Sequence, residues 1–223
     1  MILGQFDNQL IRGVVSLLSL VNKYKIIPIL RGMELEDARF LVDCFREADL
    51  KILEVSLNQP NSLHVLENLV KEFGDDMVIG AGTVLTKEIA IDAKNAGSMF
   101  FLSPSVSKQV AETAAEMSIP YIPGAFSPTE IQYASELGAE VIKVFPVRQV
   151  GASYIKDVLA SLNTVSLLAV GGVGPENMRE FFEAGVKGVG VGSSLVAQEW
   201  IEKRDRNKII ARLKEYKRIV QEN

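Results

Sequence analysis

The chain of 223 residues is poor in the residue types that build disulfides and histidine-rich metal centres. It contains one cysteine, Cys44, and one histidine, His64. A single cysteine excludes an internal disulfide and fits a reducing compartment, so we expect a cytoplasmic protein. A single histidine excludes a metal site with several histidine ligands, and His64 lies in a helical pattern where a surface position is expected. Acid–base chemistry would therefore fall to carboxylates and lysines.

The sequence also lacks a long apolar run and a surplus of positive charge. No run is long enough to span a bilayer, and the apolar stretch 14–21 has no small-residue cleavage site, so we expect neither a membrane span nor a signal peptide. The formal net charge of −4 argues against nucleic acid as the main partner. With 48% apolar residues the chain is typical of a globular protein with a substantial core, and we expect one domain over residues 1–223.

A strand followed by a helix recurs eight times along the chain. A helix from Asp7 or Asn8 to about Asn22 precedes these units, and we expect the segment 1–24 to pack on the remainder. The predicted strands are 26–30, 52–57, 77–80, 100–102, 121–122, 141–145, 167–170 and 189–191. The predicted helices after them are 35–48, 63–73, 87–96, 108–117, 128–137, 152–162, 175–184 and 207–221.

Eight evenly sized units of this kind predict an α/β fold, a (β/α)8 TIM barrel with an additional N-terminal helix. A doubly wound open sheet is the competing architecture. It seldom contains eight such units, and no GxGxxG sequence follows the first strand. The barrel is the preferred prediction, and it directs attention to the carboxyl ends of the strands, where barrel enzymes place their chemistry.

Lys143 stands in the short apolar strand 141–145, which Pro146 ends. Such a strand is normally buried on both faces, and lysine is almost never fully buried without a partner. The side chain could extend out of the core at the strand end or pair with a carboxylate. Alternatively, desolvation could lower its pKa until the neutral amine attacks a carbonyl.

Glu54 and Arg31 are two further charged residues at predicted strand ends. Glu54 lies between Leu53 and Val55, and could form a structural ion pair or act as a general acid and base. Arg31 follows the first strand, and could be a surface residue or bind a carboxylate or phosphate. Asn58, Thr83 and Ser103 also follow predicted strands and are candidate substrate-binding residues.

Two glycine turns follow the seventh and eighth strands. Gly171 and Gly172 belong to the first turn, and Gly192 and Ser193 belong to the second. Glycine could serve there only to make the turn. Turns after strands seven and eight, however, form the phosphate site of many barrels, so we predict phosphate binding at these four residues.

The sequence resembles the class I aldolases that cleave 2-keto-3-deoxy-6-phospho sugar acids, a family that includes 4-hydroxy-2-oxoglutarate aldolases. The resemblance extends from about Ile26 to the C-terminal helix. It rests on the motifs Glu-Val-Ser-Leu at 54–57, Gly-Ala-Gly-Thr-Val at 80–84, Ile-Pro-Gly at 122–124, Lys-Val-Phe-Pro at 143–146, Ala-Val-Gly-Gly-Val at 169–173 and Gly-Ser at 192–193.

The resemblance implies a role for each candidate residue. Lys143 would form the Schiff base, Glu54 would shuttle protons, and Thr83 and Arg31 would hold the keto-acid carboxylate. The glycine turns would hold the phosphate. The expected products are pyruvate and glyceraldehyde 3-phosphate, or pyruvate and glyoxylate, in carbohydrate metabolism of the Entner–Doudoroff type. The resemblance further implies a phosphorylated keto-acid substrate, no metal or cofactor, and a homotrimer.

Three positions depart from the phosphogluconate-cleaving pattern. Asn58 stands where those members typically have arginine, Val170 stands where they usually have threonine, and Ser127 stands where threonine is common. The first two departures make the phosphogalactonate-type members more similar. Two rival functions share the phosphate turns: a phospho-sugar isomerase or epimerase, and a barrel that binds a phosphometabolite without catalysis.

Overall fold

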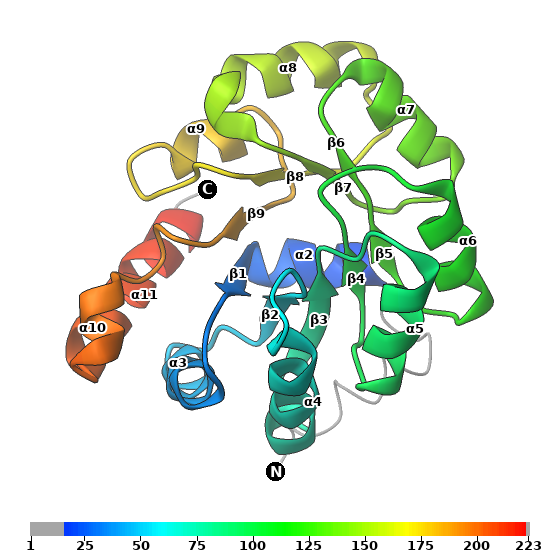
Figure 1. Ribbon diagram of the computed structural model, residues 1–223. Helices are drawn as coiled ribbons and strands as arrows, with labels where there is room; N and C mark the ends of the chain where they lie inside the picture. Colours follow the sequence, from blue (N-terminus) through cyan, green and yellow to red (C-terminus); the bar gives the residue numbers. More distant parts are fainter. Residues whose placement is uncertain (1–15, 222–223) are drawn as a thin grey trace.

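The computed structural model describes residues 16–221, which form a ring of parallel strands surrounded by helices (Figure 1). The strands are β1 Ile26–Arg31, β2 Ile52–Ser56, β3 Val78–Gly82, β4 Phe101–Leu102, β5 Tyr121–Ile122, β6 Gly124–Ala125, β7 Ile142–Val144, β8 Leu167–Val170 and β9 Gly188–Val191. The helices are α2 Leu17–Tyr24, α3 Leu35–Glu47, α4 Ser62–Phe73, α5 Lys87–Asn95, α6 Lys108–Glu116, α7 Pro128–Glu136, α8 Gly151–Ser161, α9 Met178–Glu183, α10 Gln198–Glu202 and α11 Arg206–Gln221, with a 3-10 turn η2 at Val147–Gln149.

The ring closes at Pro123, which separates β5 from β6. The strand order is β5-β4-β3-β2-β1-β9-β8-β7-β6, so β5 and β6 are the two ends of the sheet and only one residue lies between them. On one side β5 pairs with β4, and on the other β6 pairs with β7. The Lys143 N–H donates to the Pro123 carbonyl at 2.9 Å. Residues 121–125 thus serve as one interrupted fifth strand, and the predicted barrel is confirmed.

Some element boundaries differ from the prediction for local reasons. The helix predicted from Asp7 or Asn8 to Asn22 is observed from Leu17, because Ser16 has extended backbone and its Oγ accepts the Ser19 N–H at 3.1 Å. Positions 7–15 lie outside the described residues. Helix α9 begins at Met178 rather than at Pro175, because Gly174–Asn177 forms a turn in which the Asn177 side chain accepts the Gly174 N–H. The short helix α10 was not predicted.

Two hydrophobic layers hold the barrel together. The outer layer fills the space between strands and helices, and includes Leu53, Phe101 and Val144. The inner layer fills the barrel interior, and includes Ile52, Leu102 and Val141. Neighbouring residues of one strand alternate between the layers because successive side chains of a strand point to opposite faces.

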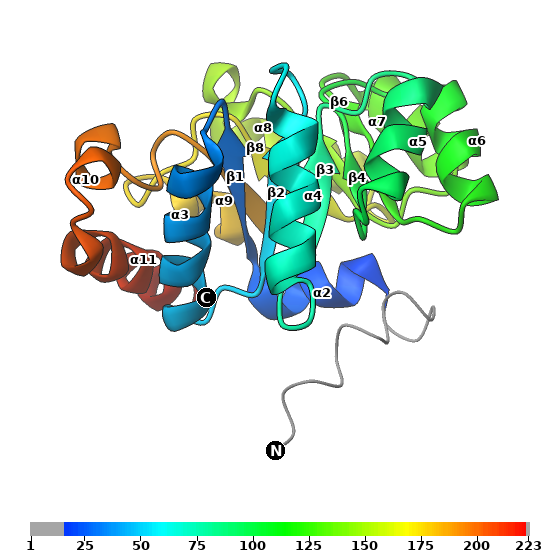
Figure 2. The same ribbon diagram turned by 60° about the horizontal axis from the view of Figure 1, so that its bottom comes forward.

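Helix α2 lies across the end of the barrel at which the strands begin (Figure 2). Its buried residues Leu17, Leu20 and Val21 belong to the same cluster as the inner layer. Since α2 covers this end, access to the interior is left to the opposite end, where the strands finish.

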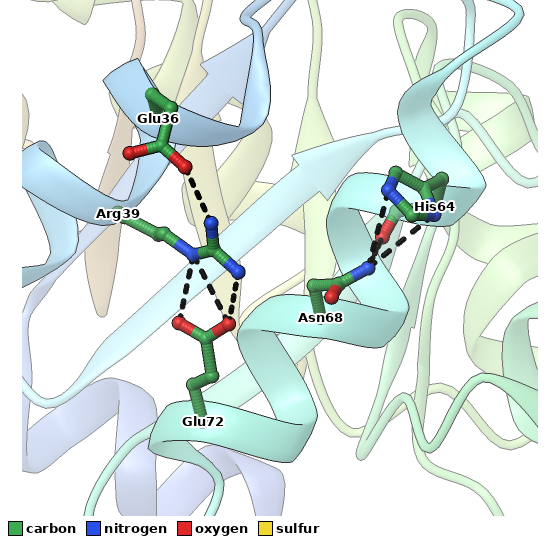
Figure 3. Close-up of polar contacts among 5 residues, drawn as sticks. All are labelled: Glu36, Arg39, His64, Asn68 and Glu72. Carbon is green, nitrogen blue, oxygen red and sulfur yellow. Dashed lines mark hydrogen bonds and ion pairs between the residues drawn. The ribbon is translucent and has the colours of Figure 1, made fainter.

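Helices α3 and α4 are joined on the surface by an arginine (Figure 3). The Arg39 Nε atom donates to both carboxylate oxygens of Glu72, at 3.0 and 2.8 Å, and Nη1 contacts Glu36. The same figure shows His64 beside Asn68 on the exposed side of α4, as the sequence predicted. Across residues 16–221, no helix combines the length and apolar character needed to cross a membrane.

Candidate active site

Strand alternation brings Glu54 and Lys143 into the barrel interior. Ile52 of β2 and Val141, which directly precedes β7, belong to the inner hydrophobic layer, and each charged residue follows two positions later along the same extended segment. Residues two apart in a strand share a face, so both charged side chains point inward. Glu54 is 1% exposed and Lys143 is 3% exposed. The sequence therefore placed both on the correct strands, and the alternation explains why they are buried.

The Glu54 carboxylate is buried without a hydrogen-bond partner among the described residues. It lies against Gly82 of β3: a Cβ atom at that glycine would be 2.5 Å from Glu54 Oε1. Burial raises the pKa of Glu54 above its ordinary value, while the positive charges of Lys143 and Arg31 oppose that rise. A carboxyl group with a raised pKa holds its proton more readily than one in water, which suits a group that takes and returns a proton.

The Lys143 ammonium is buried in the same interior. Burial lowers the pKa of Lys143 from its ordinary value of 10.5, Glu54 opposes that change, and Arg31 adds to it. The Nζ atom lies 5.1 Å from the centre of the Phe145 ring. A desolvated amine of lowered pKa is available in its neutral, nucleophilic form.

A cavity of about 550 Å³ opens at the ends of β1, β8 and β9. Arg31 is exposed and lines it, together with the four residues predicted to bind phosphate: Gly171, Gly172, Gly192 and Ser193. Phe145 lines the cavity and also contacts Lys143, so it connects the cavity to the buried lysine. Arg31 is likewise electrostatically coupled to Glu54 and Lys143. The structure thus gathers seven predicted residues at one end of the barrel.

The glycine turn after β8 has a backbone that only glycine adopts easily. Gly171 and Gly172 have φ values of +90° and +93°. The Asn177 side chain donates to the Gly172 carbonyl at 2.9 Å and accepts the Gly174 N–H at 2.9 Å. These two hydrogen bonds hold the turn in one shape at the cavity wall.

Thr83 and Asn58 are linked through a residue that the sequence analysis did not select as a site residue, Ser56. The Ser56 hydroxyl is buried and lies 2.8 Å from Thr83 Oγ1 and 3.1 Å from Asn58 Oδ1. Thr83 has φ +62°, a strained backbone for a β-branched residue. Ser56 is the last residue of β2, Asn58 follows that strand and Thr83 follows β3, and none of the three lines the cavity. Strand alternation was the signal that could have identified Ser56, because it shares a face with Glu54.

Ser103 is buried, and its hydroxyl is hydrogen-bonded within the protein. It follows Leu102 of the inner layer by one position, and its hydroxyl donates to the Ser105 carbonyl and shares a hydrogen bond with the Tyr121 hydroxyl. Ser103 does not line the cavity. Its predicted contact with substrate stays a prediction.

Arg148 lines the cavity although the sequence analysis did not select it. It lies on the turn η2, after the lysine strand, where no regular pattern indicates a direction for the side chain. Within residues 16–221, no three His, Cys, Asp or Glu side chains are grouped as metal ligands would be.

Comparison with known proteins agrees with this geometry. The profile of the family "Aldolase: KDPG and KHG aldolase" matches residues 17–212. The chain is 33% identical to 2-dehydro-3-deoxy-6-phosphogalactonate aldolase of Escherichia coli K12 over 89% of this chain and 98% of that one. It is 30% identical to 2-dehydro-3-deoxy-phosphogluconate aldolase of Treponema pallidum over 75% of this chain and 80% of that one.

Solved structures give the same result. The KDPG aldolase of Legionella pneumophila, with pyruvate captured as a covalent carbinolamine intermediate, superposes with a TM-score of 0.83 at 29% identity and covers 90% of this chain and 97% of its own. A structure described as native KDPGal superposes with a TM-score of 0.80 at 34% identity, covering 88% and 96%. The buried lysine and glutamate, the glycine turns and these matches together show that the chain belongs to the KDPG and KHG aldolase family, whose members are carbon–carbon lyases.

Proposed function

We propose that this chain is a class I aldolase that cleaves a 2-keto-3-deoxy-6-phospho sugar acid to pyruvate and glyceraldehyde 3-phosphate, with Lys143 as the Schiff-base residue. One observation carries the proposal: Lys143 and Glu54 are buried together in the barrel interior, each with a pKa displaced toward the neutral form. The cavity above them supplies Arg31 and the glycine turns to an anionic substrate.

The neutral Nζ of Lys143 attacks the C2 ketone, and loss of water gives a protonated Schiff base. This iminium accepts the electron pair of the C3–C4 bond while Glu54 takes the C4 hydroxyl proton. The aldehyde leaves, the enamine is protonated at C3, and hydrolysis releases pyruvate and the free amine. The imine serves as the electron sink, so no step requires a metal.

The two ends of the substrate need separate binding groups. We assign the carboxylate end to Arg31 and Thr83, and the phosphate end to Gly171, Gly172, Gly192 and Ser193. Holding both ends supplies the orientation that a cleavage step needs. Asn58 is linked to Thr83 through Ser56, which favours a place near the carboxylate end.

Borohydride reduction in the presence of pyruvate tests the proposal. We expect a reduced adduct on Lys143, located by peptide mass mapping, and no adduct in Lys143→Ala. The same variant should lose cleavage activity by at least about 10⁴-fold, because covalent catalysis is removed. A folded wild-type protein without an adduct at saturating pyruvate would overturn the aldolase mechanism and favour an isomerase or a binding protein.

The galactonate-type epimer is the substrate that we infer. Val170 is buried at the cavity wall, where a threonine would present a hydroxyl, and the Escherichia coli relative at 33% identity is named for that epimer. Comparison of kcat/KM for the two epimeric sugar acids tests this. A preference for the gluconate-type epimer, or equal rates, would contradict it.

We further propose a homotrimer located in the cytoplasm. The resemblance supports the trimer, and a designed cage made by fusing symmetric oligomeric domains contains a chain with a TM-score of 0.81 and 32% identity to this one. The buried, unpaired Cys44 is compatible with a reducing compartment. Light scattering of the purified protein should give three times the mass of one chain, and fractionation should recover it with the cytosol.

A further inference from the structure

Arg148 lies along the glycine turn after β8. Its backbone N–H donates to the Gly171 carbonyl at 2.9 Å. A Cβ atom at Gly172 would be 2.5 Å from Arg148 Cβ and 3.3 Å from its Nε. The guanidinium stem therefore follows the turn, and the absence of a side chain at Gly172 is what leaves room for it.

The Arg148 guanidinium has no partner in the described part of the chain. No described hydrogen bond or ion pair involves it, whereas Arg39, Arg46 and Arg206 on the outer helices each pair with a carboxylate. Glu176 also lines the cavity, but its carboxylate lies against Gly174 and forms no ion pair with Arg148. A planar donor is thus left available beside the turn.

The charges around the cavity favour an anion that carries more than one negative charge. Its charged lining residues are Arg31, Arg148 and Glu176. Arg31 is coupled to the buried pair Glu54 and Lys143, which places it toward the reacting end of the substrate. Arg148, in contrast, contacts Gly171 and Gly172 and lies at the turn where the phosphate is expected. Guanidinium groups bind phosphate through two parallel hydrogen bonds, which gives both strength and orientation.

We propose that Arg148 is a specificity-determining residue that binds the substrate phosphate beside the glycine turn after β8 and makes the enzyme select phosphorylated aldehydes. The inference rests on the proposed function, because it assigns a residue to the phosphate end of that substrate. The backbone N–H groups of the glycine turns carry no formal positive charge. Arg148 would add a positive charge to the phosphate site.

The test measures substrate preference in the direction of aldol addition. Pyruvate is offered with glyceraldehyde 3-phosphate or with unphosphorylated glyceraldehyde, and the two kcat/KM values are compared. In Arg148→Met the ratio should fall by about 10- to 100-fold, the usual effect of losing a hydrogen bond to a charged group. Inhibition by inorganic phosphate should weaken by a similar factor. Arg148→Lys, which keeps the charge without the planar fork, should lose less.

Lys156→Met is the matched control, because it removes one positive charge from the exposed side of α8, outside the cavity lining. It should leave the ratio and the phosphate inhibition at wild-type values. If Arg148→Met does not fold, as judged by thermal unfolding, Arg148→Gln gives the same comparison. An unchanged ratio in a folded variant would overturn the proposal. Failure of the proposed function would differ, because the wild-type protein itself would then form no pyruvate adduct on Lys143.

Discussion

At the scale of single residues, burial acts in opposite directions on the two groups at the centre of the site. It penalises the charged form of each, so the pKa of Lys143 falls and the pKa of Glu54 rises. Their mutual attraction works against both changes. The result is an amine and a carboxyl group whose protonation can change closer to neutral pH than in water, which imine formation and proton transfer both require.

The pH dependence of Lys143 reactivity should follow from this coupling. Labelling of Lys143 by a neutral amine-reactive reagent, quantified by peptide mapping, should rise with pH about a midpoint below 10.5. In Glu54→Gln the midpoint should shift to lower pH, because the negative charge that raises the lysine pKa is gone. Cleavage should slow by about 10²- to 10⁴-fold in the same variant. An upward shift of the midpoint would contradict the assigned interaction.

At the scale of elements, two glycines of strand β3 face the interior but serve different purposes. A Cβ atom at Gly80 would be 2.5 Å from the Phe100 ring, and one at Gly82 would be 2.5 Å from the Glu54 carboxylate. Phe100 is a fully buried part of the inner layer and has no room to move. The Glu54 carboxylate is the end of a flexible side chain and can move, but then leaves its position in the site.

Substituting alanine for Gly80 should therefore lower mainly the stability of the protein, and substituting alanine for Gly82 should lower mainly its activity. Gly80→Ala should reduce the free energy of unfolding by about 1–3 kcal/mol through overpacking. Gly82→Ala should change stability less, and should lower kcat by about 10- to 100-fold, because a displacement of about 1 Å at a catalytic group has that effect. Thermal unfolding and steady-state kinetics of both variants check this. Equal losses of stability would argue against the distinction.

At the scale of the whole molecule, the closed barrel separates a stabilising end from a reactive end. Helix α2 packs its apolar side onto the inner layer where the strands begin, and the cavity lies where β1, β8 and β9 end. An effect of one end of the barrel on the other would have to be transmitted through the packed interior. Changes in α2 should therefore act on stability alone.

Leu17→Ala tests this separation. Leu17 is 2% exposed and belongs to the interior cluster, so its truncation should lower the free energy of unfolding by about 2–5 kcal/mol. Below the melting temperature kcat and KM should stay within about twofold of wild type, since additivity holds for distant sites. Chemical denaturation and kinetics at 25 °C provide the two measurements. A large loss of kcat in folded protein would show that the two ends are coupled.

The sequence by itself determined the barrel and the two central groups. Strand periodicity, the repeated strand–helix unit and the lone charged residues in apolar strands are local signals. They can be read from the sequence because successive side chains of a strand point to opposite faces. The positions of Lys143, Glu54, Arg31 and the glycine turns in or after predicted strands followed from these signals, whereas their roles were implied by the family resemblance. The limits of the fifth strand and of α9 could not be predicted. Pro123 interrupts the strand, and the hydrogen bonds of the Asn177 side chain form the turn before α9, and both effects depend on the folded backbone.

Only the tertiary structure decided how the residues at and after the strand ends contact one another. Ser56 joins Thr83 to Asn58 across two strands, Ser103 is held by Tyr121, and Arg148 reaches Gly172 from a different turn. In each case the contact depends on how neighbouring strands are staggered and on where a loop turns. These contacts form only when the ring of strands closes, so the residue pattern along a single strand cannot predict them.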